Sequence, residues 1–168
     1  MKRKIEAFAY AKDILEAGGK GVLLTTCADG QVDTMTIGWG TMGIQWGKPI
    51  FIAYVRESRF TKELVDKNGE FTINVPFGAY DKNILGFCGT KSGRDVDKIK
   101  ELGLTLEAGE TVSVPAIKEL PLTLECKVIY KQEQAKDAIA PENLERYYAD
   151  GDFHTAYYGQ ITAAYIVE

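Results

Sequence analysis

The sequence predicts a mainly β protein, a β-barrel with inserted helices. Apolar and β-branched segments of strand length recur along the chain, among them GVLLTTC, PIFIAYV and EFTINVP, and proline stops the last of them. We count about six or seven such segments against two or three helical ones. Because the helices do not alternate regularly with the strands, a small antiparallel barrel is favoured over a parallel βαβ sheet.

The length of 168 residues and the 45% hydrophobic content suit one substantial core. We therefore predict a single domain over residues 1–168, in which residues 1–19 form an N-terminal helix or arm. The turn ADGQ predicts a hairpin between GVLLTTC and VDTMTIGWG. RESRFTKELVDKNG predicts a loop and a short helix that ends at Gly69. PENLERYYADGD predicts a helix and a turn. PLTLECKVIYKQEQ and HTAYYGQITAAYIVE predict the last strands of the chain.

The charge balance argues against a polyanionic partner. The 20 Lys and Arg residues face 24 Asp and Glu residues, so the net charge is −4 and no overall positive field recruits nucleic acid or an acidic membrane. The basic start MKRK is not followed by an apolar signal segment, and no apolar run is long enough to span a bilayer. We expect a cytoplasmic protein that contacts neither nucleic acid nor membrane.

The cysteines and the histidine argue against a metal site. Cys27, Cys88 and Cys126 are widely spaced and odd in number, and His154 is the only histidine. Structural zinc needs about four clustered ligands, and a disulfide scaffold needs an even set. We expect reduced, mostly buried thiols.

The segment GWGTMG, residues 38–43, matches the glycine pattern of dinucleotide-binding folds. That fingerprint needs a helix directly after it, so that the pyrophosphate lies at the helix N-terminus. Here IQWGKPIF follows, which predicts a turn and a strand. We therefore interpret the glycines either as an irregular strand end, where the backbone lies close to a flat group, or as a bulge in the barrel wall.

Two segments contain the parts of an anion site. In CGTKSGRDVDK, Ser92 and Gly93 precede a helix predicted to begin near Arg94, and Lys98 would lie about one turn later on the same helical face. The alternative is a capped surface helix with solvated charges. In RESRFT, a second predicted helix start has Ser58 and Thr61 as capping hydroxyls beside Arg56 and Arg59. Two such helix starts could converge on one phosphate.

Taken in order, TMTIGWG, YVRESRFT, FTINVP, CGTKSGRDVDK and GDFHTAYYGQI resemble the flavin reductase-like, FMN-binding split-barrel family, and within it the flavoredoxin group. The resemblance starts at about residue 20, and SGRDVDK and TIGWG are its most specific parts. It implies a homodimer of split barrels that binds FMN noncovalently near the subunit interface. Apolar strands such as PIFIAYV and ITAAYIV also favour a dimer.

The resemblance also implies roles for individual residues. The isoalloxazine would lie beside residues 36–39, which are Thr36, Ile37, Gly38 and Trp39, and His154 would approach it from the last strand. The ribityl chain and phosphate would face Ser58, Arg59 and Thr61, with Ser92, Arg94 and Lys98 completing the phosphate end. Family members often have Asn where this chain has Asp33, and a carboxylate cannot donate the hydrogen bonds of an amide.

The residues alone leave alternatives for three of the aromatic side chains. His154 follows DGDF and suits an exposed turn, although an imidazole beside a flavin could stabilise its reduced anion or steer a substrate. By composition, Trp39 and Trp46 are expected in the core rather than against a cofactor.

Three functions remain open. In the first, NAD(P)H donates a hydride to bound FMN, which passes electrons to an acceptor; the cofactor carries that chemistry, so no catalytic acid, base or nucleophile is required. In the second, the protein is an electron carrier that does not oxidise NAD(P)H itself and serves a small-molecule or protein redox partner. In the third, it binds a flavin or another phosphate-bearing ligand without redox turnover.

Overall fold

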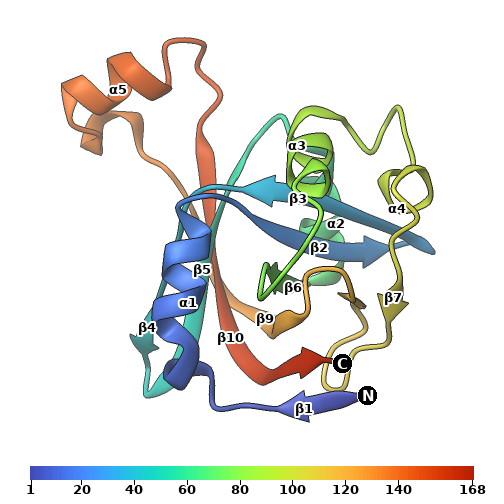
Figure 1. Cartoon of the computed structure of the whole chain (residues 1–168). Coiled ribbons are helices and arrows are strands. Elements are labelled where there is room, and N and C mark those ends of the chain that lie inside the picture. The colour runs from blue at the N-terminus through green and yellow to red at the C-terminus, as the bar shows by residue number, and fades with distance from the viewer.

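Strands form most of the regular structure in the computed structural model, which describes all 168 residues. The strands are β1 (Lys2–Lys4), β2 (Val22–Ala28), β3 (Gln31–Ile37), β4 (Gly40–Gln45), β5 (Lys48–Arg56), β6 (Glu70–Val75), β7 (Leu106–Glu107), β8 (Ala116–Ile117), β9 (Leu122–Glu133) and β10 (His154–Val167). The helices are η1 (Ala7–Tyr10), α1 (Ala11–Gly18), α2 (Phe60–Asn68), α3 (Asn83–Thr90), α4 (Lys98–Glu101), η2 (Lys136–Ala138) and α5 (Pro141–Tyr147). Figure 1 shows their arrangement.

One antiparallel sheet has the strand order β3-β2-β6-β9-β10-β5-β4, and β1 pairs with the C-terminal end of β10. β10 pairs with β5 only through residues 154–160, whereas it pairs with β9 almost throughout. Two register shifts interrupt the β9–β10 ladder, one between Tyr158 and Gly159 and one between Ile161 and Ala163. A Cβ at Gly159 would lie 2.5 Å from the Phe71 ring, so the glycine lets this ring pack against the bend. The sheet curls at this point, as a barrel requires.

The main core lies inside the curled sheet. Leu24, Phe71, Ile73 and Leu124 belong to its largest cluster and are fully buried. Ile14 of α1 joins the same cluster, so the predicted N-terminal helix packs against the core of the barrel. The predicted mainly β fold is confirmed.

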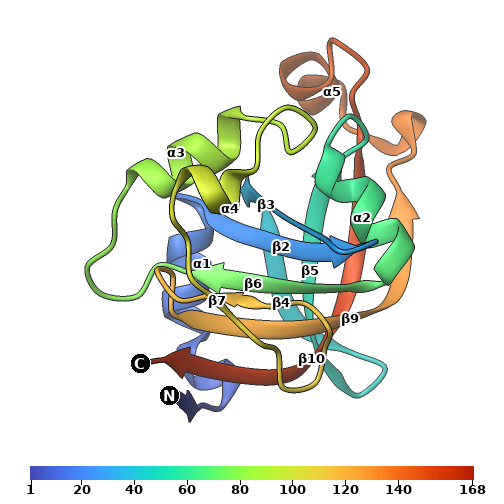
Figure 2. The same ribbon diagram turned by 90° about the vertical axis from the view of Figure 1, so that its right-hand side faces the viewer.

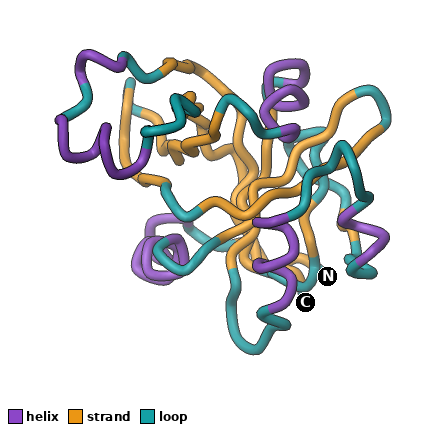
Figure 3. Tube along the Cα trace, turned by 90° about the horizontal axis from the view of Figure 1, so that it is seen from above, coloured by secondary structure: helices purple, strands orange, loops and turns teal.

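Three helices position the site by packing on the β2–β3 hairpin. α2 contacts both strands, α3 also contacts both, and α4 contacts β3 (Figure 2). Seen from above, the helices lie around the outside of the strands (Figure 3). α5 lies between β9 and β10 in the chain and projects away from the sheet (Figure 1).

Most predicted elements are present, with two differences. β4 was not predicted as a separate strand, because GWGTMG alternates poorly; it pairs with β5 across a turn at Trp46 and Gly47. β1, β7 and β8 were also missed, since two or three residues give no periodicity. GWGTMG runs into β4 and not into a helix, in agreement with the strand interpretation.

Candidate functional site

Two adjoining pockets lie where β3 ends. The polar pocket has a volume of about 300 Å³ and lies between β3, the start of α2 and the 88–98 segment. The aromatic pocket has a volume of about 180 Å³ and lies between the end of β3, β5 and the start of β10. The two pockets share Met35, Thr36 and Arg59. A ligand can therefore extend from one pocket into the other along β3.

All eleven sequence-predicted site residues line these pockets. The polar pocket contains seven of them: Thr36, Ser58, Arg59, Thr61, Ser92, Arg94 and Lys98. The aromatic pocket contains Ile37, Gly38, Trp39 and His154, together with the shared Thr36 and Arg59. Segments far apart in the sequence thus meet at one place, although several side chains make contacts that differ from those predicted.

Lys98 and Arg94 do not share a helical face. α4 begins at Lys98 rather than near Arg94, because residues 92–96 form a turn in which Ser92 O accepts from the backbone of Asp95 and Val96. The side chain of Asp97 caps α4 by accepting from the Lys100 backbone. The predicted open helix start, with its free backbone N–H groups, is therefore wrong.

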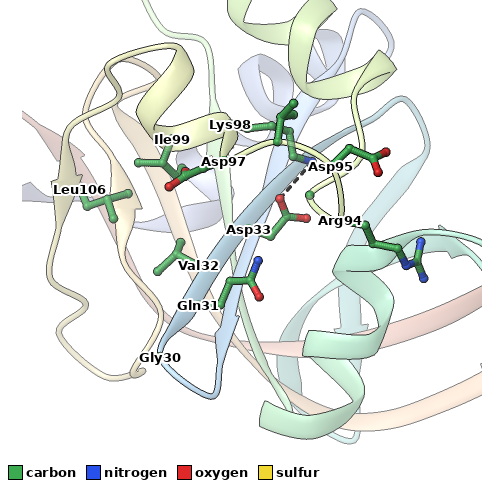
Figure 4. Close-up of a pocket in the computed structure, with 12 residues that line it drawn as sticks. Gly30, Gln31, Val32, Asp33, Arg94, Asp95, Asp97, Lys98, Ile99 and Leu106 are labelled. Atoms are coloured by element: carbon green, nitrogen blue, oxygen red, sulfur yellow. Dashed lines mark ion pairs between the residues drawn. The ribbon is translucent and has the colours of Figure 1, made fainter.

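Lys98 instead forms a buried ion pair. Its Nζ lies 3.1 Å from Oδ1 of Asp33, and the two side chains are 2% and 3% exposed. Figure 4 shows this pair, with Arg94 pointing away from it toward α2. Arg94 donates to the Ser58 carbonyl and to the Glu63 carboxylate at the surface. Both cations predicted in SGRDVDK to hold a phosphate are therefore paired with carboxylates.

The predicted capping roles of Ser58 and Thr61 are also wrong. The N-cap of α2 is Arg59, and no side-chain hydrogen bond caps this helix. Ser58 Oγ donates to the Asp152 carboxylate over 2.6 Å, and Thr61 Oγ1 donates to Asp33 over 2.6 Å. Since each hydroxyl has one proton, these side chains can only accept a hydrogen bond from a ligand.

Arg59 and Lys91 are the unpaired cations of the polar pocket. Both side chains are exposed and line the pocket, and neither forms an ion pair or a side-chain hydrogen bond within the protein. Lys91 was missed as a site residue. The sequence offered a signal, because Lys91 lies within the same basic segment, but nothing distinguished it from the cations that fold onto carboxylates.

The aromatic pocket is built from the backbone of residues 37–39 and from rings. A Cβ placed on Gly38 would meet no atom within 4 Å, so open space lies over this backbone. Trp39 packs on Tyr147 at 5.0 Å and on His154 at 4.9 Å between ring centroids. Trp39 and Trp46 are 41% and 62% exposed, so the prediction of core tryptophans is wrong. The core of the barrel is filled instead by aliphatic side chains with Phe51, Phe71 and Tyr157.

His154 is the first residue of β10 and only 7% exposed, so the exposed-turn alternative is wrong. Its Nδ1 lies 2.8 Å from the Tyr148 hydroxyl, and its backbone N–H donates to Gln134. Burial, together with the smaller effects of Arg56 and Arg59, lowers the pKa of His154 to about 4, while Asp152 and Glu57 oppose the shift. The imidazole is therefore neutral at pH 7.

The cysteines supply no nucleophile to the site. All three are free, and Cys88 and Cys126 are buried. Burial raises the pKa of the Cys88 thiol to about 11, although nearby Lys98 opposes the shift. Cys88 lines the polar pocket as a protonated, unreactive thiol.

The chain belongs to the flavin reductase like domain family, whose pattern matches residues 18–168. The fold is that of the FMN-binding split barrels. The flavoredoxin of Desulfovibrio vulgaris (Miyazaki F) is 26% identical with a TM-score of 0.69, over 88% of this chain and 69% of that chain. A flavoredoxin from Methanosarcina acetivorans is 28% identical with a TM-score of 0.67, over 88% of this chain and 68% of that chain.

Curated relatives match over shorter segments. An uncharacterized protein of Archaeoglobus fulgidus is 33% identical over 101 residues, which is 60% of this chain and 56% of that protein. Protein YddH of Escherichia coli is 31% identical over 96 residues, which is 56% of this chain and 50% of that protein. The matches span about half the length of these relatives. No helix of this chain combines the length and apolar character needed to cross a bilayer.

Proposed function

We propose that this protein binds FMN across the two pockets and serves as a redox protein that transfers a hydride or electrons from NAD(P)H through FMN to an acceptor. One observation carries the proposal. A polar pocket with two unpaired cations, Arg59 and Lys91, continues into an aromatic pocket through Thr36 and Arg59. This arrangement suits a ligand with an anionic end and a flat end, as FMN has.

The residues present fit each end of FMN. At the phosphate end, Arg59 and Lys91 can pair with phosphate oxygens, and the Ser92 and Arg94 side chains lie in the same pocket. At the ring end, the open space over Gly38 leaves the backbone of residues 37–39 free for a flat group. Solved relatives with this fold include proteins described as flavoredoxins and as FMN-binding, which supports the choice of flavin.

Asp33 and Lys98 have a different task in this proposal. Because their charges neutralise each other inside the protein, they hold the 88–98 segment against β3 and do not attract the phosphate. Thr61 supports the pair through its hydrogen bond to Asp33. The phosphate then lies toward the exposed Arg59 and Lys91 side of the pocket.

When bound, FMN supplies the hydride and electron chemistry. The chain's own residues bind and orient it: the two free cations fix one end, and Trp39, Gly38 and the neutral His154 line the other. No charged side chain except Arg56 and Arg59 lines the aromatic pocket, and Arg56 donates to the Asp152 and Tyr147 carbonyls.

We also propose a homodimer. The aromatic pocket encloses only about 180 Å³ at the ring end, so a second copy can complete the cover over the ring. Ile44 and Trp46 are 72% and 62% exposed near the β4–β5 turn. The ring centroids of Tyr130 and Trp46 lie 6.0 Å apart. Such an apolar patch suits burial against another chain.

Anaerobic stopped-flow mixing of the FMN-loaded protein with NADH and with NADPH tests the reductase. We expect rapid bleaching of the flavin absorbance with at least one of them. Absence of bleaching with both, in a protein that chemical reductant does bleach, would contradict the reductase and leave an electron carrier that does not oxidise NAD(P)H itself.

A further inference from the structure

Tyr148 and His154 form a hydrogen-bonded pair behind the aromatic pocket. The Tyr148 hydroxyl lies 2.8 Å from Nδ1 of His154, and the two residues are 6% and 7% exposed. Tyr148 directly follows α5 and stacks on Phe153 at 5.0 Å, with Arg56 over its ring at 5.4 Å. The phenol is therefore held firmly against the imidazole.

The other ring nitrogen, Nε2, opens into the aromatic pocket. Every fully buried side-chain nitrogen and oxygen of the protein has a hydrogen-bond partner. Nε2 of His154 has none within the protein, so it is reached from outside, and His154 lines the aromatic pocket. The two nitrogens of the ring thus face different surroundings: Nδ1 faces Tyr148, and Nε2 faces the pocket.

The chemistry of the pair decides which nitrogen has the proton. A neutral imidazole has one N–H and one lone pair. A phenol is a much better hydrogen-bond donor than acceptor toward a basic nitrogen, and the Tyr148 hydroxyl has no other hydrogen bond. The phenol therefore donates to Nδ1, which leaves the imidazole proton on Nε2.

We propose that Tyr148 is a positioning residue that holds His154 as the neutral tautomer protonated on Nε2, with this N–H directed into the aromatic pocket. His154 then acts there as a hydrogen-bond donor, and neither as a base nor as a cation. Its partner would be a carbonyl oxygen or a ring nitrogen, on a flavin or on an electron acceptor. The identity of this partner rests on the proposed function, whereas the tautomer is set by the protein alone.

Nitrogen NMR on the flavin-free protein tests the tautomer directly. Because His154 is the only histidine, ring-¹⁵N-labelled histidine gives just two signals. At pH 7 we expect the signal of a protonated nitrogen at Nε2 and of an unprotonated one at Nδ1. In Tyr148→Phe, the ratio of the Nε2–H to the Nδ1–H form should fall about three- to tenfold, which one lost hydrogen bond accounts for.

Tyr147→Phe is the matched control. Tyr147 also packs on Trp39, but it makes no hydrogen bond to His154, so its variant should keep the wild-type ratio. A wild-type proton on Nδ1 would overturn the proposal, even if neither variant folds. An unchanged ratio in Tyr148→Phe, or an equal change in both variants, would overturn it as well. None of these outcomes depends on FMN binding, so a failure here is separate from a failure of the proposed function.

Discussion

The ammonium group of Lys98 and the carboxylate of Asp33 form an ion pair inside the protein, 3.1 Å apart and almost fully buried. Gly93 allows this contact. A Cβ there would lie 2.5 Å from Asp33 Oδ1 and 2.7 Å from the Phe60 ring. The segment SGRDVDK therefore folds around Asp33, with the glycine permitting the approach and the lysine neutralising the charge. Of its two basic residues, Lys98 forms the buried pair with Asp33, and Arg94 forms an exposed pair with Glu63.

We predict that Lys98→Met lowers the free energy of unfolding by about 3 to 5 kcal/mol, because it leaves the Asp33 carboxylate buried and unpaired. The double variant Asp33→Asn with Lys98→Met should recover most of this loss. Urea unfolding measures both. Arg94→Ala is the control, since its exposed pair with Glu63 should contribute no more than about 1 kcal/mol. Equal losses in the two single variants would contradict a structural role for the buried pair.

Gly93→Ala should lower the free energy of unfolding by about 1 to 3 kcal/mol, because its methyl group overlaps the Asp33 carboxylate and the Phe60 ring. Gly86→Ala in α3 is the opposite case. Nothing lies within 4 Å of a Cβ there, so the variant should gain about 0.5 to 1 kcal/mol from helix propensity. Thermal and urea unfolding of both variants check this. If Gly93→Ala left the free energy of unfolding unchanged, the loop would not need the close contact between Gly93 and Asp33.

Gly38→Val should weaken FMN binding at least about tenfold, because the side chain would fill the space over the 37–39 backbone. The change in the free energy of unfolding should stay within about 0.5 kcal/mol, since no atom lies in the way. Flavin fluorescence titration gives the affinity. Gly43→Val is the control, in open space on β4 and outside both pockets. Unchanged affinity in Gly38→Val would place the ring elsewhere.

His154 should make the protein less stable in acid. Its pKa falls from the usual 6.5 to about 4 on folding, mainly through burial, so between these values the unfolded chain binds a proton that the folded chain does not. The stabilising contribution is complete above about pH 6.5 and is lost as the pH falls toward 4, by up to about 3 kcal/mol. In His154→Gln, unfolding free energies measured across this range should depend less on pH. Parallel curves for the two proteins would refute the assignment.

Much of the barrel could be predicted from the sequence, because strand periodicity and turn residues are local signals. GVLLTTC and EFTINVP are buried strands as expected, and Gly69 ends α2 in the left-handed conformation. The residues predicted for the site also lie together, around two adjoining pockets. Their partners were not predictable, because Lys98 meets Asp33 and Ser58 meets Asp152 across 65 and 94 residues. Such long-range pairs leave no periodic trace in the sequence.

The central claim is that the polar pocket holds the FMN phosphate through Arg59 and Lys91, and parallel titrations with FMN and riboflavin test it most directly. The wild-type protein should bind FMN at least about tenfold more tightly than riboflavin. Arg59→Ala and Lys91→Ala should each weaken FMN binding about ten- to a hundredfold and leave riboflavin binding unchanged, whereas Arg94→Ala, already paired with Glu63, should have a smaller effect. Equal affinities for FMN and riboflavin in the wild-type protein would contradict the claim.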